Sequence, residues 1–204
     1  LRKYQWVTIP LELHGVVALK NGDVIRVSVG NGEGDPKFTI DDLLPHLGAE
    51  QNKKPLAEAI PAETLNLLLG SEPIGDAEES GRVKLAVMKL LNEKYGITEY
   101  DFLSAELELV PAFQVTDIGF DRSMIGGYGH DDRVCAYPAL MAVLDQKIPD
   151  DTVITILTDK EETGSDGNTG LNSDYLRYFV ADLAMQEGLE PRHVLSRSAC
   201  LSAD

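Results

Sequence analysis

The sequence has few cysteines, histidines and aromatic residues, and it has no long apolar run. Its 204 residues include two cysteines and four histidines, and aromatic residues make up 6%. No apolar stretch approaches the roughly 18 residues that a membrane-spanning helix requires, so a membrane partner is not expected. The N-terminal residues form no secretion signal and include no initiator methionine. We therefore interpret the chain as starting within a longer polypeptide.

Positive charge is also scarce. The chain has 18 Lys and Arg residues against 34 Asp and Glu residues, which gives a net charge of −16. Such a surface repels phosphate backbones and anionic lipids, so nucleic-acid and membrane binding are excluded as functions. Cys135 and Cys200 lie in apolar sequence and match no zinc or thiol-redox spacing. We interpret them as buried free thiols in a reducing cytoplasm.

The residues that are present predict a globular α/β protein with two domains. Hydrophobic residues make up 43% of the chain and charged residues 25%, as in a folded soluble domain. Short β-branched and aromatic segments predominate before residue 111, and apolar strands alternate with helices after it. The alternation indicates a mixed sheet with helices on both faces. We therefore expect a β-rich domain at 1–111 and a partial α/β domain at 112–204.

Local patterns predict individual elements. Strands are expected at 4–10, 15–19, 24–29, 105–110, 113–118 and 152–157, with the start of another at 199–204. Helices are expected at 41–47, 78–95, 133–144 and 173–187. The sequence Lys-Asn-Gly-Asp at 20–23 indicates a hairpin turn, and Gly96 is placed to end the second helix. Thr98 and Asp101 have the spacing of a capping box.

Carboxylates stand at the ends of several predicted elements. Glu161 and Glu162 follow the strand expected at 152–157, Asp204 ends the last strand-like segment, and Asp131 opens a helix after a glycine-rich loop. Ligands of α/β domains bind at the carboxyl ends of strands, so these side chains are expected to converge. Two catalytic metal ions about 3.5–4 Å apart need a bridging carboxylate. Taken one at a time, the same residues also fit an exposed acidic loop and a helix start.

Together these segments resemble the aspartyl aminopeptidase family of binuclear zinc aminopeptidases. The resemblance covers essentially the whole chain, as a fragment with the inserted domain and part of the catalytic domain. It is carried by the motifs GGYGHDDRVCAY at 126–137, DKEETGS at 159–165 and SAD at 202–204. Segments at 10–17, 42–47 and 104–111 are similar to the inserted domain of the family. The family fold is a zinc-exopeptidase sheet with helices on both faces and a β-rich inserted domain.

The resemblance assigns a role to each carboxylate. It implies that Asp131 bridges two zinc ions and that Glu161 is the general base. Glu162 then binds one zinc ion and Asp204 the other. The family completes its site with two histidines, and neither position is present among these 204 residues.

Two histidines of the chain stand close to these motifs. His130 precedes the bridging aspartate but does not occupy a ligand position of the family. His46 lies in a Leu-Pro-His-Leu segment of the inserted domain. It is a candidate for contact with the active site of a neighbouring subunit, or else a hydrogen-bonded turn residue.

The resemblance thus implies a cytoplasmic metallo-aminopeptidase with two Zn²⁺ per subunit. Its substrates would be peptides, with acidic N-terminal residues preferred, and it would form a homo-oligomer through the β-rich domain. The isolated chain is expected to be inactive because both histidine ligands are absent. Two alternatives remain open, namely another two-metal amidase such as a deacylase, and a non-catalytic oligomerisation fragment.

Overall fold

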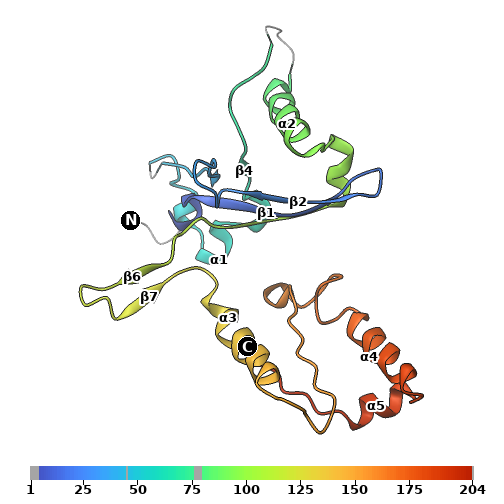
Figure 1. Ribbon diagram of the computed structural model, residues 1–204. Helices are drawn as coiled ribbons and strands as arrows, with labels where there is room; N and C mark the ends of the chain where they lie inside the picture. Colours follow the sequence, from blue (N-terminus) through green and yellow to red (C-terminus); the bar gives the residue numbers. More distant parts are fainter. Residues whose placement is uncertain (1–4, 45, 76–79, 204) are drawn as a thin grey trace. The chain divides into compact units, whose positions relative to one another are not determined.

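The computed structural model describes residues 5–44, 46–75 and 80–203 (Figure 1). The chain divides into two compact units, at 1–127 and 128–204. Both helices and small antiparallel sheets are present, which confirms the mixed α/β class. The domain boundary predicted at residues 111 and 112 stays a prediction.

The described elements are of three types, which alternate along the chain. The strands are β1 Leu11–Ala18, β2 Val24–Val29, β3 Thr39–Ile40, β4 Leu67–Leu68, β5 Ala105–Pro111, β6 Thr116–Ile118 and β7 Met124–Gly126. The α-helices are α1 Leu56–Ala59, α2 Arg82–Tyr95, α3 His130–Leu144, α4 Tyr175–Gln186 and α5 Pro191–Arg197. The 3₁₀ helices are η1 Gln5–Thr8, η2 Gln51–Lys53, η3 Ala62–Thr64, η4 Glu99–Ser104 and η5 Glu161–Thr163.

The first unit is built on a three-stranded antiparallel sheet of order β2-β1-β5 (Figure 1). The predicted turn at 20–23 joins β1 to β2, and it is closed by the Leu19 N–H on the Asp23 carbonyl at 2.7 Å. In the middle strand, Gly15 has a φ of +150°. A Cβ at this position would lie 2.0 Å from the carbonyl oxygen of Glu106 on β5. The close pairing of β1 with β5 therefore requires glycine there.

The core of this unit forms where α2 and its exit segment meet the sheet. Val17, Val27, Val29 and Ile97 are buried together. Leu91 and Tyr95 of α2 are among the half-buried side chains that pack against this cluster. Helix α2 ends as predicted at Gly96, whose φ of 72° is left-handed. The chain is thereby turned back so that Ile97 enters the core.

One buried carboxylate connects this exit segment to the sheet. Asp101 is 4% exposed, and its side chain accepts the Thr98 N–H at 2.8 Å and the Thr98 hydroxyl at 2.6 Å. These contacts confirm the predicted capping box of η4. Asp101 also accepts the backbone N–H of Lys20 at 2.9 Å, across 81 residues of sequence. These hydrogen bonds favour the ionised form and hold the pKa of Asp101 below its ordinary value.

The second unit contains helices and long loops. Helix α3 begins earlier than predicted, and α4 covers most of the helix expected at 173–187. Among the described residues of this unit, the buried hydrophobic side chains are Val180 and Ala184, both on α4. Helix α5 was not predicted from the sequence. It begins at Pro191, a residue that suits the first turn of a helix because its missing N–H needs no partner there.

Four element predictions are wrong, three of them for identifiable reasons. Residues 152–157 form no strand, because the described residues supply no hydrogen-bonded neighbour strand. The segment predicted as a strand at 4–10 contains η1 instead, and Pro10 has no N–H for a ladder. The described part of 41–47 forms a turn rather than a helix, since Pro45 disfavours the helical conformation of the residue before it.

The structure also tests the expectations for the cysteines, for a membrane-spanning helix and for the C-terminal strand. Neither cysteine forms a disulfide, and the prediction that both are buried is wrong: Cys135 is half-buried, and Cys200 is exposed because it lies in an irregular segment after α5. In the described parts of the chain, every helix is too short or too polar to span a bilayer. The strand expected at 199–204 is absent from 199–203, and Asp204 lies outside the described residues.

We expect Ile97→Ala to lower the free energy of unfolding by about 2–5 kcal/mol, because it leaves a cavity in the core. Ile97 is 1% exposed and is one of the four residues of the buried cluster. Urea unfolding followed by circular dichroism measures the change. Leu90→Ala on α2 is the control, since Leu90 is 65% exposed and alanine suits a helix. An equal loss in both variants would contradict the assigned core.

We expect Asp101→Asn to destabilise the protein at neutral pH and much less in acid. The folded-state pKa of Asp101 lies below its unfolded-state value, so ionised Asp101 stabilises the fold above the unfolded-state pKa. This contribution is lost as the pH falls through the folded-state pKa. Urea midpoints of wild type and variant, measured from pH 7 down to about pH 3, should therefore converge. Asp41→Asn, at an exposed position, should show no such convergence.

Candidate metal centre

Asp131 lies in an irregular turn at the start of α3. The N-cap Gly129 has a left-handed φ of 87°, and Asp131 itself has non-helical angles of φ −78° and ψ 116°. The peptide bond between Asp131 and Asp132 is cis. The Arg133 guanidinium reaches back to donate to the Gly129 carbonyl at 3.3 Å. Asp131 is exposed, so its carboxylate is open to an ion from solvent.

Glu161 and Glu162 lie on a tight loop that follows residues 152–157. They form η5 between Lys160, with a φ of 67°, and Gly164, with a φ of 94°. The loop is closed by the Ser165 N–H on the Lys160 carbonyl at 2.7 Å. Both glutamates are exposed. A short 3₁₀ turn with left-handed residues at both ends thus holds two adjacent carboxylates outside regular structure.

Asp159 fixes the base of this loop. Its backbone N–H donates to the Thr169 carbonyl at 3.1 Å, and its carboxylate accepts the Thr169 hydroxyl at 3.3 Å and pairs with Lys160 Nζ at 3.3 Å. Desolvation raises the pKa of Asp159, but the hydrogen bonds and the charge of Lys160 outweigh it, and the pKa falls below its ordinary value. An ionised Asp159 therefore ties residues 159–169 into one closed loop.

A further constraint on this loop comes from a buried glycine. A Cβ at Gly170 would lie 2.1 Å from the carbonyl oxygen of Ser165, so only glycine fits beneath the loop. The next residues help to line a cavity of about 310 Å³ beside it. Its apolar lining includes Ile156, Leu157 and Leu171. The sequence analysis did not predict this cavity. Gly170 is a local feature of the sequence that could have indicated a close backbone approach there.

The structure describes three of the four residues predicted to form the metal site. Asp131, Glu161 and Glu162 belong to the second unit, and Asp204 lies outside the described residues. Within 5–44, 46–75 and 80–203, no three His, Cys, Asp or Glu residues are grouped closely enough to hold a metal ion. The assignment of these ligands stays a prediction.

The candidate histidines are at the surface. His46 is exposed in a turn of the first unit, where the Leu47 N–H donates to the Leu44 carbonyl at 2.9 Å. His130 is the exposed first residue of α3, next to the candidate bridging aspartate. His193 is exposed on α5.

Known proteins resemble this chain over its whole described length. The family model for "Aminopeptidase I zinc metalloprotease (M18)" matches residues 2–204. A relative from Clostridium acetobutylicum named "Probable M18 family aminopeptidase 1" is 50% identical over 208 residues, which cover 100% of this chain and 45% of the relative. A relative of the same name from Borrelia garinii subsp. bavariensis is 46% identical over 212 residues, with coverage of 100% and 46%.

Solved structures agree with the sequence comparisons. The M18 aminopeptidase of Thermotoga maritima superposes with a TM-score of 0.79 at 45% identity, covering 95% of this chain and 42% of that one. Aminopeptidase I of Clostridium acetobutylicum gives a TM-score of 0.76 at 51% identity, with coverage of 93% and 41%. The chain spans a little under half the length of the curated relatives it matches. With its full sequence matched and its fold shared, the chain belongs to the aminopeptidase I zinc metalloprotease (M18) family.

Proposed function

We propose that the protein is a zinc-dependent aminopeptidase that removes N-terminal residues from peptides. The observation that carries this proposal is the pair of irregular, solvent-accessible turns that present Asp131 and Glu161–Glu162 within one compact unit. Membership of a zinc metalloprotease family supports it. Irregular backbone suits such a site, because adjacent side chains can then point to different ligands.

The chemistry of the donor set fits zinc in part. Carboxylate oxygens are ordinary zinc ligands, and a catalytic zinc ion takes about three protein ligands. In our proposal Asp131 bridges two ions, Glu162 binds one and Asp204 binds the other. The 204 residues lack histidines at the two remaining positions of the resemblance. The carboxylates of this chain therefore form part of each coordination shell, and the chain by itself is proposed to be inactive.

Glu161 is proposed as the residue that moves the proton. Zinc supplies Lewis-acid polarisation of the scissile carbonyl and makes a water molecule a better nucleophile. A carboxylate oxygen of Glu161 accepts the proton of the attacking water, and the same oxygen returns it to the leaving amine. The hydrogen bonds between Asp159 and Thr169 close the backbone loop that carries Glu161.

The finer parts of the proposal concern substrate, assembly and location. A preference for acidic N-terminal residues follows from the resemblance and awaits a substrate panel. We propose a homo-oligomer formed through the β-rich domain, with His46 able to contact the active site of a neighbouring subunit. The exposure of His46 supports that contact. We propose a reducing, cytoplasmic location, as the resemblance implies.

In the full-length protein, we expect Glu161→Gln to lower kcat about 10²- to 10⁴-fold, because the amide cannot accept a proton. Release of the N-terminal residue from Asp-, Glu-, Leu- and Lys-peptides, with and without a chelator, measures activity and specificity together. Glu187→Gln is the matched control, because Glu187 is an exposed residue after α4. Full activity in Glu161→Gln would exclude Glu161 as the base.

Zinc content distinguishes ligands from the base. We expect Asp131→Asn to reduce the zinc bound per subunit, because an amide is a weaker ligand than a bridging carboxylate. Glu161→Gln should keep the wild-type zinc content while losing activity. Elemental analysis of dialysed full-length protein measures both. Equal zinc loss in the two variants would contradict the proposed division of roles.

Zinc binding and substrate cleavage by the full-length protein also distinguish the aminopeptidase from the two alternative functions. A protein that binds zinc and cleaves N-acyl amino acids, but no free-amine peptide, would be a two-metal deacylase instead. A protein that binds no zinc and cleaves neither substrate would be a non-catalytic assembly module. Chelator-sensitive cleavage of the peptide panel supports the aminopeptidase.

A further inference from the structure

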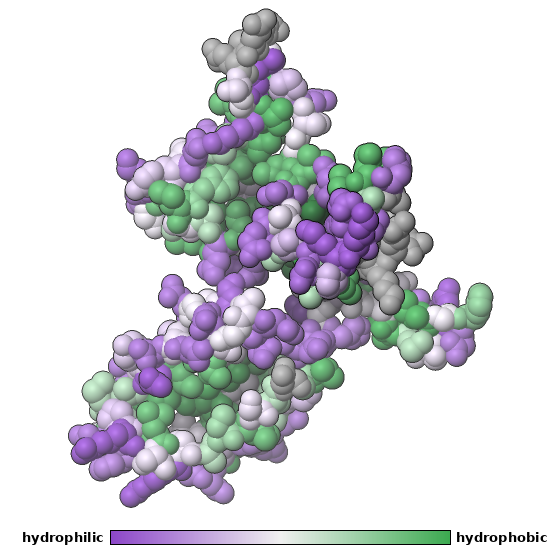
Figure 2. Space-filling view, turned by 180° about the vertical axis from the view of Figure 1, so that it is seen from behind, coloured by the Kyte–Doolittle hydropathy of each residue, from purple (hydrophilic) through white to green (hydrophobic). Residues whose placement is uncertain are grey.

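The loop that carries Glu161 and Glu162 has no hydrophobic side chain. Residues 159–170 read DKEETGSDGNTG, so every side chain of this segment is polar or charged, apart from the glycines. In the second unit, Figure 2 shows apolar side chains gathered together, with hydrophilic ones around them. A segment without apolar side chains gains little from the hydrophobic effect. The conformation of this loop therefore depends on hydrogen bonds.

Two residues of the loop other than glycine have left-handed backbone angles. Lys160 has a φ of 67° and Ser165 has a φ of 60°, before and after η5. Such angles bring the Cβ of an L-residue close to the following carbonyl oxygen. They persist only where the surrounding structure fixes them. Contacts from another part of the chain are needed to hold both residues.

Asn172 reaches this loop through its side-chain amide. Its Nδ2 donates to the Gly164 carbonyl at 3.1 Å and to Asp166 Oδ1 at 3.2 Å. An amide nitrogen carries two hydrogens, so both bonds can form at once. Gly164 in turn donates its N–H to the Glu161 carbonyl at 2.9 Å. A path of two hydrogen bonds therefore connects the amide of Asn172 with the backbone of the candidate base.

The backbone of Asn172 holds the same loop at a second point. Its N–H donates to the Ser165 carbonyl at 3.1 Å, and the Ser165 N–H donates to the Lys160 carbonyl at 2.7 Å. The side-chain amide meanwhile binds the residues directly before and after Ser165. Asn172 thus bonds to three successive residues of the loop, and its two hydrogen-bonded paths lead to Lys160 and Glu161.

We propose that Asn172 is a positioning residue for the reaction, because it fixes the backbone from which Glu161 acts as the base. This inference rests on the proposed function and adds a residue to its site. In this role Asn172 contacts neither the substrate nor the attacking water, and it acts through Gly164 and Ser165. A reacting group that is displaced by about 1 Å can lose roughly two orders of magnitude in rate.

The exposure of Asn172 distinguishes this role from a purely structural one. When its hydrogen bonds are removed, water can bond to the Gly164 carbonyl and to the Asp166 carboxylate, so the free energy of unfolding should change little. The loop can then leave its left-handed conformation while the rest of the unit stays folded. Variants of Asn172 should therefore lose turnover without losing stability.

Hydrogen exchange tests the loop directly and does not depend on catalysis. In the full-length protein, we expect Asn172→Asp and Asn172→Ala to speed exchange of the amides at 160–166 about tenfold or more. Aspartate keeps the size of the side chain but has no amide hydrogens, and alanine removes them without adding a charge. Asn168→Asp is the matched control, since it adds the same charge to the same loop at an exposed asparagine. Unchanged exchange in both Asn172 variants would overturn the proposal.

Steady-state kinetics of the same proteins test the consequence for the reaction. We expect Asn172→Ala to lower kcat about 10- to 100-fold, while KM, zinc content and the urea midpoint stay close to those of the wild type. A parallel loss of zinc or stability would indicate a purely structural role and overturn the positioning role.

Wild type and Glu161→Gln, measured alongside, separate this inference from the proposed function. A wild type that cleaves no peptide, or a fully active Glu161→Gln, would overturn the proposed function and this inference with it. An active wild type, an inactive Glu161→Gln and an unchanged kcat in Asn172→Ala would overturn this inference alone.

An exchange of two side chains provides a rescue. Adding Asp166→Asn to Asn172→Asp places the amide on the other partner, so that the bond between the two side chains can form again. We expect the double variant to recover part of the kcat that Asn172→Asp loses, since the bond to the Gly164 carbonyl stays absent. A double variant that is no more active than Asn172→Asp would contradict the assigned pairing.

Discussion

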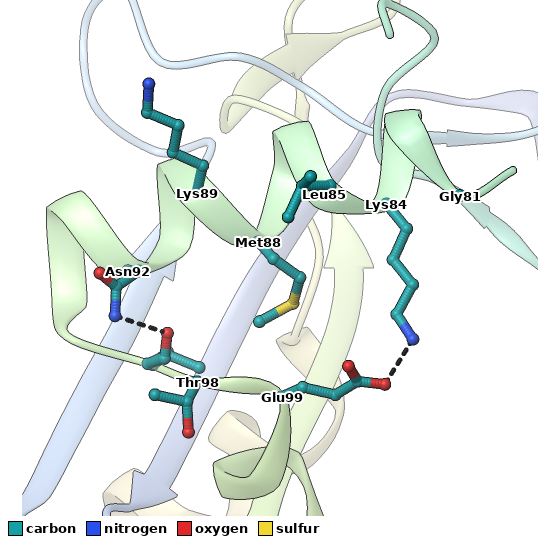
Figure 3. A pocket seen from close by; sticks show the side chains of 9 residues that line it. Gly81, Lys84, Leu85, Met88, Lys89, Asn92, Thr98 and Glu99 are labelled. Atoms are coloured by element: carbon teal, nitrogen blue, oxygen red, sulfur yellow. Dashed lines mark hydrogen bonds and ion pairs between the residues drawn. The ribbon is translucent and has the colours of Figure 1, made fainter. Parts of the chain in front are cut away.

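The first unit depends on the buried carboxylate of Asp101. Three donors meet on this side chain, two from Thr98 and one from the backbone of Lys20. It therefore joins the turn after β1 to the segment that connects α2 with β5. The neighbouring Ser104 hydroxyl donates to the Ala18 carbonyl at 2.6 Å and strengthens the same junction. Ile97 and Thr98 of this connecting segment also line a pocket beside α2 (Figure 3).

Features set by local chemistry could be predicted from the sequence. The turn at 20–23, the left-handed Gly96 and the capping box of Thr98 with Asp101 each depend on residues a few positions apart, and all three are present. The failures at 4–10 and 41–47 involve prolines, whereas the failure at 152–157 depends on a distant partner. The β-branched run at 152–157 is strand-like, yet a strand forms only with a neighbour to accept its hydrogen bonds. The partner of Asp101 at Lys20 was likewise invisible to local patterns.

The candidate site shows the same division. Its residues were found by motif, and the structure adds that Asp131 lies at the non-helical start of α3 and that Glu161 and Glu162 lie in the short 3₁₀ helix η5. Sequence could suggest the glycine-rich approach to Asp131 but not the left-handed Lys160 before the glutamates, because non-glycine residues seldom adopt a positive φ. The hydrogen bonds of Asp159 with Thr169 explain how that conformation is kept. The cavity beside Gly170 depends on the closed loop and so required three-dimensional information.

The pairing of β1 with β5 bears on how the protein is made. Leu11 lies opposite Pro111, so the middle strand β1 pairs with a strand that is synthesised much later. During synthesis the β1–β2 hairpin therefore leaves the ribosome with the outer edge of β1 unpaired, and this edge is a template for mispairing until β5 is made. The intervening segment can nevertheless change in length at little cost, because loop-closure entropy grows only slowly with the number of residues. The same topology thus makes nascent chains vulnerable and makes the region between β2 and β5 tolerant of insertions.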